Sequence, residues 1–443
     1  MEVHLLNPQT ADPSLPEVHS TVGISASPIF WRRLAGFLGP GFMISVGYMD
    51  PGNWATDIAG GSRFGYTLLF AIMASNLLAI LLQSLALKLG VATERDLAQL
   101  CRERFSLPVS FMLWQFAEVA IAACDLAEVI GSAIALQLLF HIPLLWGVMI
   151  TSLDVLVILV LQSRGFRYVE ALVIALIATI VVLFMMQLGL SHPDYAPIFR
   201  NLFVPSPEII HNRAMLYIAI GILGATVMPH NLYLHSSIVQ SRKYERTSAG
   251  KREAILMANL DSVLALTLAL FVNAAILIVA AAVFHRSGHL EVVGIEDAYR
   301  LLSPLAGVTG ASTLFAVALL ASGQNSSLTG TLAGQVVMEG FIHLHVRPWL
   351  RRLITRSLSI LPTVVVVALM GERGTEKLLL LSQVILAMQL SFAVVPLVLF
   401  TSNRKLMGEF VNARWLTAVS WCAAALIAGL NAWLLVKEFS GGV

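Results

Sequence analysis

Long, nearly uncharged apolar blocks run through most of this chain and limit what it can fold into. Of its 443 residues, 57% are hydrophobic and only 12% are charged, and the mean hydropathy is +0.80. A soluble protein of this length could not bury so much apolar surface. Many blocks reach ~20 residues, the length of a helix that crosses a bilayer core of ~30 Å. The sequence therefore predicts an all-α integral membrane protein, because a helix satisfies its own backbone polar groups inside lipid.

Apolar blocks bounded by charge, glycine and proline predict eleven transmembrane helices. Their approximate ranges are 34–59, 66–90, 107–138, 142–163, 167–190, 214–239, 254–284, 305–340, 353–371, 377–401 and 414–436. If the N-terminus is cytoplasmic, twenty of the 28 Lys and Arg residues fall in inside segments. The positive-inside rule thus favours a cytoplasmic N-terminus and an extracytoplasmic C-terminus.

The chain has few features outside these spans. Residues 1–33 are rich in Pro and Ser and lack a basic region followed by an apolar core, so we expect a disordered cytoplasmic tail rather than a signal peptide. Residues 34–443 are predicted to form one membrane domain surrounded by the lipid bilayer. The net charge of +2 is too small to indicate a nucleic-acid partner. The three cysteines are widely spaced, which argues against a disulfide or metal role.

Matching interruptions occur in the first and sixth predicted spans. The first reads Asp-Pro-Gly-Asn at residues 50–53, where proline removes a backbone donor and glycine permits non-helical dihedrals. Placing the Asp50 charge at the bilayer centre costs at least ~2.5 kcal/mol. The sixth span reads Met-Pro-His-Asn at residues 228–231, which shares the pattern x-Pro-x-Asn. Each proline could simply kink its helix, but paired breaks in matching halves indicate the binding site of a transporter.

The residue types at these breaks suggest which ion would bind. Asp50, Asn53 and carbonyls freed near Tyr48 or Ala225 would form an oxygen site that also suits calcium or magnesium. Met228 stands before its proline as Asp50 does, and its soft thioether favours manganese, ferrous iron and later first-row metals. Methionine is often core filler, which is the alternative. A single carboxylate leaves a doubly charged ion uncompensated, which favours the reversible binding that transport needs.

Three carboxylates of the third span could carry protons. On a helix Glu118, Asp125 and Glu128 fall within a sector of about 80°, so one face is acidic. Because that face cannot meet lipid, it is predicted to face the bundle interior or a wet cavity. The acids could relay protons or form fixed ion pairs. His230 and His235 could also relay protons, since histidine titrates near physiological pH.

The chain resembles the Nramp family (natural resistance-associated macrophage proteins), and in particular its bacterial members, from about residue 34 to the C-terminus. The resemblance rests on four motifs, which are the two breaks, Asp125-Leu-Ala-Glu128 and Ser382-Gln383-Val. It implies a LeuT-type fold in which helices 1 and 6 are broken. The two inverted five-helix repeats would cover about residues 34–190 and 214–401, and an extra helix would cover about 414–436.

The resemblance also implies proton-coupled import of manganese and ferrous iron across a bacterial plasma (inner) membrane. The implied metal ligands are Asp50, Asn53, Met228 and the Ala225 carbonyl, with Gln383 approaching in the inward-closed state. The implied proton path runs from Asp50 and His230 through Glu128 and Asp125 towards Arg352 and Arg351. Metal ion and protons would be substrates, no cofactor is implied, and we expect the protein to function as a monomer.

Other classes of protein fit the pattern less well. No span contains a motif such as His-Glu-x-x-His or a clustered nucleophile, and the loops are too short for a soluble catalytic domain, so we expect no enzyme. An amino-acid transporter would hold a substrate carboxylate that Asp50 would repel. A channel would show a continuous polar lining with rings of like residues. A divalent-cation channel, or a uniporter without obligatory proton coupling, is the main alternative.

Overall fold

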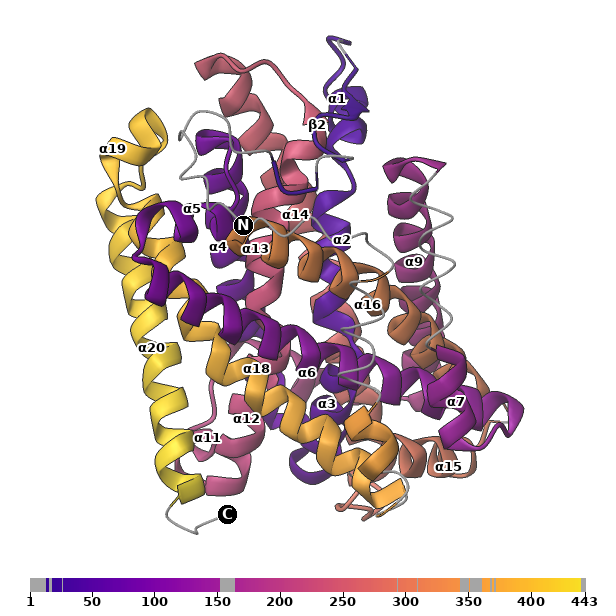
Figure 1. The fold of residues 1–443 in the computed structure, drawn as a ribbon. Coiled ribbons are helices and arrows are strands. Elements are labelled where there is room, and N and C mark those ends of the chain that lie inside the picture. Colours follow the sequence, from indigo (N-terminus) through magenta and orange to yellow (C-terminus); the bar gives the residue numbers. More distant parts are fainter. Residues whose placement is uncertain are drawn as a thin grey trace.

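The computed structural model describes residues 13–15, 18–25, 27–151, 164–292, 294–308, 310–342, 350, 361–366, 369 and 372–439. This part of the chain is almost entirely helical, as predicted (Figure 1). Seven of its helices are long and apolar enough to cross a membrane. The count of eleven spans stays a prediction, because parts of the fourth and ninth predicted spans lie outside the described residues.

The first predicted repeat begins with the broken first span. The elements of this repeat are α1 (Phe30–Phe37), α2 (Pro40–Val46), the 3-10 helix η1 (Gly47–Met49), α3 (Pro51–Phe64), η2 (Gly65–Leu68), α4 (Leu69–Thr93), α5 (Leu97–Arg104), α6 (Leu107–Phe140), α7 (Leu144–Thr151) and α9 (Phe166–Ser191). The first span is therefore three helical pieces rather than one, as the proline and glycine at its centre require.

The rest of the chain contains the broken sixth span. Its elements are α10 (Tyr195–Phe203), α11 (Glu208–His211), α12 (Arg213–Thr226), α13 (Pro229–Ile238), η3 (Val239–Ser241), α14 (Ser248–Ala280), a π-helical turn η4 (Ala281–His285), α15 (Ile295–Ala306), α16 (Ala311–Ile342), α18 (Glu372–Thr401), α19 (Arg404–Met407), η5 (Gly408–Phe410) and α20 (Arg414–Phe439). The predicted span at 305–340 corresponds to α16, which begins only at Ala311 because a turn with Gly307 and Gly310 at positive φ separates it from α15.

Small residues let the central helices cross closely. Figure 1 shows α6, α16 and α18 running on a slant across the middle of the bundle, with α20 at its edge. At the contact of α6 with α16, a Cβ added to Gly323 would lie only 2.2 Å from Ser132 Oγ. Gly131 of α6 leaves similar room for the Pro51 ring, since an added Cβ would lie 2.2 Å from its Cγ. Small residues at such crossings are how membrane helices gain van der Waals contact.

The two ends of the bundle are distinct. In Figure 1, α1, α5, α19 and the short strand β2 (Arg242–Lys243) lie at one end, which we call the N side. Helices α11 and α15 lie at the opposite end, which we call the far side.

Part of the segment predicted to be a disordered tail is packed on the N side, so that expectation is wrong for these residues. Leu15, Val18 and Val22 are 1%, 5% and 5% exposed and belong to the main apolar core. The strand β1 (Val22–Gly23) pairs in parallel with β2. Three apolar side chains in a polar segment are enough to dock it, because each buried side chain of this size contributes about 1.5–3 kcal/mol.

Candidate metal site

The first break is held open by its own sequence. Helix α2 ends at Val46, η1 makes one tight turn, and Asp50 is extended with φ −68° and ψ 164° before Pro51 starts α3. Asp50 caps α3, because its Oδ1 accepts a hydrogen bond of 2.9 Å from the Asn53 backbone N–H. Asp50 and Asn53 are 0% and 2% exposed. The break therefore places a carboxylate in the middle of the bundle.

Side chains from elsewhere satisfy the carbonyls that this break leaves without helical partners. Asn273 of α14 donates to the Tyr48 carbonyl over 2.8 Å. Ser322 of α16 donates to the Met49 carbonyl over 2.5 Å, and Trp54 Nε1 donates to the same oxygen over 3.1 Å. Such pairing is needed because no water or lipid group can satisfy a buried carbonyl at this depth.

The second break is shorter and less polar. Helix α12 ends at Thr226, Val227 and Met228 are extended, and Pro229 starts α13. Met228 is fully buried, and its side chain packs with residues of α6 and α18. No side chain caps the start of α13.

Oxygen atoms from both breaks converge on one nitrogen atom. Asn53 Nδ2 donates to Asp50 Oδ1 over 2.6 Å, to the Ala225 carbonyl over 3.1 Å and to the Gly47 carbonyl over 3.3 Å. Asp50 Oδ2 is buried without a hydrogen-bond partner. Met228 Sδ lies 3.3 Å from the point where a Cβ on Gly47 would be. The structure thus brings together Asp50, Asn53, Ala225 and Met228, and their role as metal ligands stays a prediction.

This arrangement suits a cation once one side chain turns. Carboxylate, amide and carbonyl oxygens together with a thioether form a mixed ligand set that borderline transition metals accept. In the present rotamer the Asn53 amide points its N–H groups at the other oxygens, so the amide must rotate for its Oδ1 to face an ion. Within the described residues, no group of three or more His, Cys, Asp and Glu side chains is placed to hold a metal, so a cation here would depend on amide, carbonyl and thioether ligands besides Asp50.

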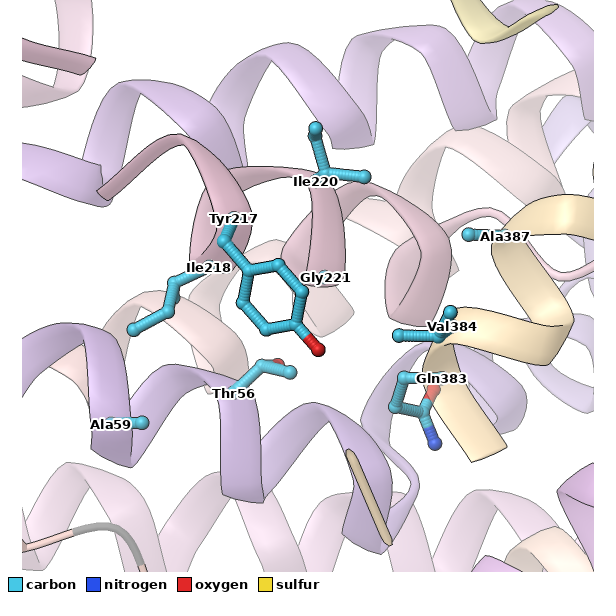
Figure 2. A pocket seen from close by; sticks show the side chains of 9 residues that line it. All are labelled: Thr56, Ala59, Tyr217, Ile218, Ile220, Gly221, Gln383, Val384 and Ala387. Atoms are coloured by element: carbon cyan, nitrogen blue, oxygen red, sulfur yellow. The ribbon is translucent and has the colours of Figure 1, made fainter. Parts of the chain in front are cut away.

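Gln383 of α18 reaches the first break. A Cβ added to Gly52 would lie 1.7 Å from Gln383 Nε2, so only glycine lets the amide come this close. Gln383 Oε1 is buried without a hydrogen-bond partner. Gln383 also lines a small cavity of about 20 Å³ between α3, α12 and α18, into which Tyr217 points its hydroxyl (Figure 2). The open space beside the site therefore lies among the halves of the broken helices that lead to the far side.

On the N side the site is closed by a buried chain of hydrogen bonds. Gln83 of α4 donates to the Tyr48 hydroxyl over 2.8 Å, and its Oε1 lies 2.9 Å from His235 Nδ1. All three side chains are fully buried. His235, which the sequence predicted to be a proton carrier, is thus part of the hydrogen-bonded chain that closes the site on the N side.

Charged groups also anchor α1 and α2 on the N side. Asp261 of α14 accepts from the Gly41 N–H over 2.6 Å and from the Gly39 N–H over 3.3 Å. Arg242, which is 1% exposed, donates to the Leu38 carbonyl over 2.7 Å and pairs with Glu170 over 2.5 Å. The junction between α1 and α2 is therefore bonded to α9, α14 and β2.

The predicted proton carriers of α6 lie near the first break. Asp125 and Glu128 are 6% and 1% exposed, and both carboxylates face Gly330 of α16, since an added Cβ there would lie 3.2 and 3.0 Å from them. Glu128 is one turn from Gly131, which contacts Pro51.

The other predicted carriers are more scattered. Glu118 is partly buried and accepts from Trp114 Nε1 over 3.1 Å. Seven residues along a helix separate it from Asp125, a rise of about 10 Å. His230 is buried beside Met228 and its Nδ1 lacks a hydrogen-bond partner. Arg351 and Arg352 lie outside the described residues.

Several residues of this region were not predicted from the sequence. Gln83, Asn273 and Ser322 are polar residues within predicted spans, and that isolation is the only local signal they give. Asp57 carried a clearer signal, because it follows Asp50 by seven residues and so lies on nearly the same face of the span. It is 1% exposed, and its Oδ2 has no hydrogen-bond partner.

The fold and the site define a multi-pass membrane transporter with its site between two broken helices. The family model described as natural resistance-associated macrophage protein-like (Nramp) matches residues 41–437. The divalent metal cation transporter MntH of Nostoc sp. is 61% identical over 436 residues, which cover 98% of each chain. The chain therefore belongs to the Nramp family of divalent metal cation transporters and is a transporter rather than an enzyme.

Solved structures agree with this assignment. A manganese transporter of Eremococcus coleocola superposes with a TM-score of 0.90 at 44% identity, covering 96% of this chain and 90% of that one. The nucleobase-cation-symport transporter Mhp1 superposes with a TM-score of 0.61 at 14% identity, covering 98% of this chain and 96% of that one. The second likeness concerns the fold alone. Together they confirm the predicted LeuT-type architecture.

Proposed function

We propose that this protein is a proton-coupled symporter that imports divalent transition-metal ions, manganese and ferrous iron, across a bacterial inner membrane. The observation that carries the proposal is the convergence of oxygens from both breaks on Asn53 Nδ2, with the Met228 sulfur beside them. A donor nitrogen at such a point stands where a cation would bind, since both attract oxygen lone pairs. The Eremococcus manganese transporter, at 44% identity, supports manganese as one substrate.

In this proposal each ligand has a distinct task. Asp50 supplies the negative charge, and Asn53 and the Ala225 carbonyl supply neutral oxygens. Met228 supplies the soft ligand that disfavours calcium and magnesium. Gln383 adds its amide oxygen from α18 while the site is closed to the cytoplasm, and its unpartnered Oε1 is free for this role.

We propose that protons move along the buried carboxylates of α6. Asp125 and Glu128 share a face that meets α16, and Glu128 lies one turn from the contact with Pro51. From Asp50 and His230 the path would pass Glu128 and Asp125 towards Arg352 and Arg351, with Glu118 and His235 as further candidate carriers. A carboxylate inside the membrane is costly unless it serves such a path or an ion pair.

We propose further that the N side faces the cytoplasm and the C-terminus lies outside, as the distribution of basic residues predicts. The present conformation is then closed inward by Tyr48, Gln83 and His235. The cavity beside Gln383 is what is left of the outward route. Transport would alternate between opening each side in turn, and we expect a monomer to carry out the cycle.

The test is manganese uptake into vesicles containing the purified protein, with and without an inward proton gradient and with excess calcium. We expect uptake that the gradient stimulates and that calcium does not compete in the wild type, whereas calcium competes in Met228→Ala. Uptake that ignores the gradient would instead support a uniporter or channel. No metal uptake under any condition would contradict the proposed function as a whole.

A further inference from the structure

Asn231 is a buried amide that none of the roles above uses. It is 0% exposed, and neither its Nδ2 nor its Oδ1 has a hydrogen-bond partner. Leaving both polar atoms of an amide unsatisfied in the interior is costly and calls for a physical reason. Asn231 stands three residues after Met228, as Asn53 stands three residues after Asp50.

The Asn231 amide also lies at the edge of the convergence point. A Cβ added to Gly47 would lie 2.3 Å from Asn231 Nδ2 and 3.3 Å from Met228 Sδ, so amide and sulfur flank the same backbone position. The carbonyl of that glycine is one of the oxygens that face Asn53 Nδ2. A half-turn of the Asn231 amide places its oxygen where its nitrogen now stands.

We propose that Asn231 is a further metal-binding residue, whose amide oxygen contacts the transported cation next to the Met228 sulfur. This inference rests on the proposed function and deepens it. The second break then contributes a hard oxygen as well as a soft sulfur, in the way that the first break contributes Asp50 and Asn53.

Manganese binding to purified protein, measured by calorimetry without any transport step, tests this role. We expect Asn231→Ala to weaken manganese binding about tenfold, as loss of one ligand of this strength would. We expect Asn231→Asp to bind more tightly than the wild type and to release the ion more slowly, because a carboxylate adds charge. Asn325→Ala is the matched control, since Asn325 is equally buried but donates to the Val173 carbonyl away from the site.

The outcomes separate the two claims. Wild-type affinity in both Asn231 variants would overturn this inference and leave the proposed function standing. Absence of saturable manganese binding to the wild type would overturn the proposed function itself. If Asn231→Ala does not fold, the manganese affinity of Asn231→Asp alone tests the inference. A merely structural defect would not raise the affinity for manganese.

A second observation concerns the docked N-terminal segment, residues 13–15 and 18–25, which we call the strap. The Leu15 N–H donates to Glu339 Oε2 of α16 over 2.8 Å. The Ser20 N–H donates to the Gln240 carbonyl of η3 over 3.0 Å, and β1 pairs with β2 just beyond α13. At its other end Ile24 packs on α1, where a Cβ on Gly36 would lie 3.4 Å from the Ile24 Cα.

These contacts connect helices on opposite sides of the N-side entrance to the site, which Tyr48, Gln83 and His235 close. The strap joins α16 and the end of α13 to α1, which leads directly into α2 and the first break. Moving α1 and α2 away from α13 and α16 would open the site to the N side, and it would have to break one end of the strap. We therefore expect the strap to keep all of these contacts only while the N side is closed.

We propose that the strap is a closing device that stabilises the N-side-closed conformation and must detach, at least in part, for the ion to leave on that side. It rests on the proposed direction of transport, but not on the identity of the metal. A covalent lock tests it directly.

The lock joins positions 23 and 243, which are Cα partners in the parallel pair and are both exposed. Neighbouring strands lie about 4.8 Å apart, within the range that a disulfide spans. In a chain lacking the three native cysteines, we expect oxidised Gly23→Cys/Lys243→Cys to transport manganese about tenfold more slowly than the reduced form. Each single-cysteine variant should transport manganese at the same rate before and after oxidation.

Loosening the strap should have the opposite effect on the closure. Val18→Asp places a charge in the core and should loosen the strap. The reporter is a cysteine in place of Ala86, which lies one turn from Gln83 towards the N-side end of α4. We expect this cysteine to react with a maleimide about tenfold faster in the Val18→Asp background than in the background with Val18. Ser25→Asp adds the same charge at an exposed position and should change nothing. Unchanged transport in the oxidised double variant would overturn the closing role. Failure of the reduced form and the wild type to transport any metal would instead overturn the proposed function.

Discussion

The two broken helices share a sequence pattern but solve different physical problems. The break in span one is polar throughout, because Asp50 caps α3 and Asn53, Asn273, Ser322 and Trp54 satisfy its carbonyls. The break in span six is two extended residues, Val227 and Met228, with no side-chain cap on α13.

This difference suggests a division of labour. A charge at the bilayer centre dominates the electrostatics of its surroundings, so we expect the first break to set how strongly any divalent cation binds. A thioether adds little to the binding of a hard ion, so we expect the second break to set which cation is preferred. Changes at the two breaks should therefore separate affinity from selectivity.

The largest effect is expected from Asp50→Asn. The new amide keeps an oxygen that can cap α3 but removes the charge, so we expect manganese uptake to fall about 100-fold, equivalent to about 2.8 kcal/mol of lost binding. Uptake into vesicles measures the loss, and the thermal unfolding midpoint in detergent should stay close to that of the wild type. Uptake within threefold of wild type would show that the first break does not set affinity.

Met228→Ala should change selectivity more than affinity. We expect manganese binding to weaken about tenfold, while calcium binding changes by less than about threefold because calcium gains little from sulfur. Competition between calcium and manganese for the purified protein measures both. Equal losses for the two ions would remove the proposed distinction between the breaks.

Two glycines allow a comparison of how tightly each break is packed against α18. A Cβ on Gly224 would lie 2.4 Å from the Ala387 Cβ and 3.0 Å from the Gln383 carbonyl, atoms that cannot move without the backbone. We expect Gly224→Ala to lower the free energy of unfolding by about 1–3 kcal/mol. In Gly52→Ala the new methyl group meets the flexible Gln383 side chain, so stability should fall less while manganese binding suffers. Chemical unfolding measures the loss of stability in both variants. A larger loss in Gly52→Ala than in Gly224→Ala would contradict the tighter packing that we infer for the second break.

The smallest effect is expected from Ser322→Ala. The Met49 carbonyl loses one donor but keeps Trp54 Nε1, so we expect a loss of only about 0.6 kcal/mol, the average for a hydrogen bond inside a membrane protein. A double-mutant comparison with Trp54→Phe should show a larger combined loss than the sum, because the carbonyl is then left unsatisfied. Simple additivity would mean that the first break does not depend on these partners.

Local sequence was sufficient wherever a single residue conflicts with a lipid-buried helix. Proline, glycine and aspartate at residues 50–53 are each unfavourable there, and so both the break and the ligand candidates around it could be predicted. The same reasoning reached Met228 only because its position matches Asp50. It missed Asp57, although the seven-residue spacing was visible.

The disorder predicted for the N-terminal tail shows the opposite case. Its composition is that of an unstructured segment, yet Leu15, Val18 and Val22 find apolar partners on the N side. Whether so few apolar residues dock depends on a complementary surface elsewhere in the fold, which composition does not reveal.

The sequence by itself determined that this chain crosses the membrane many times and breaks twice at matching places, because the cost of polar and helix-breaking residues in lipid is local. The tertiary structure alone decided which groups repair those breaks and which close the site. Asn273, Ser322 and Gln83 come from distant helices, and a free carbonyl can be satisfied by any nearby donor. Only the packing of the helices selects among such donors, since the chemistry of a hydrogen bond carries no information about where in the sequence its partner lies.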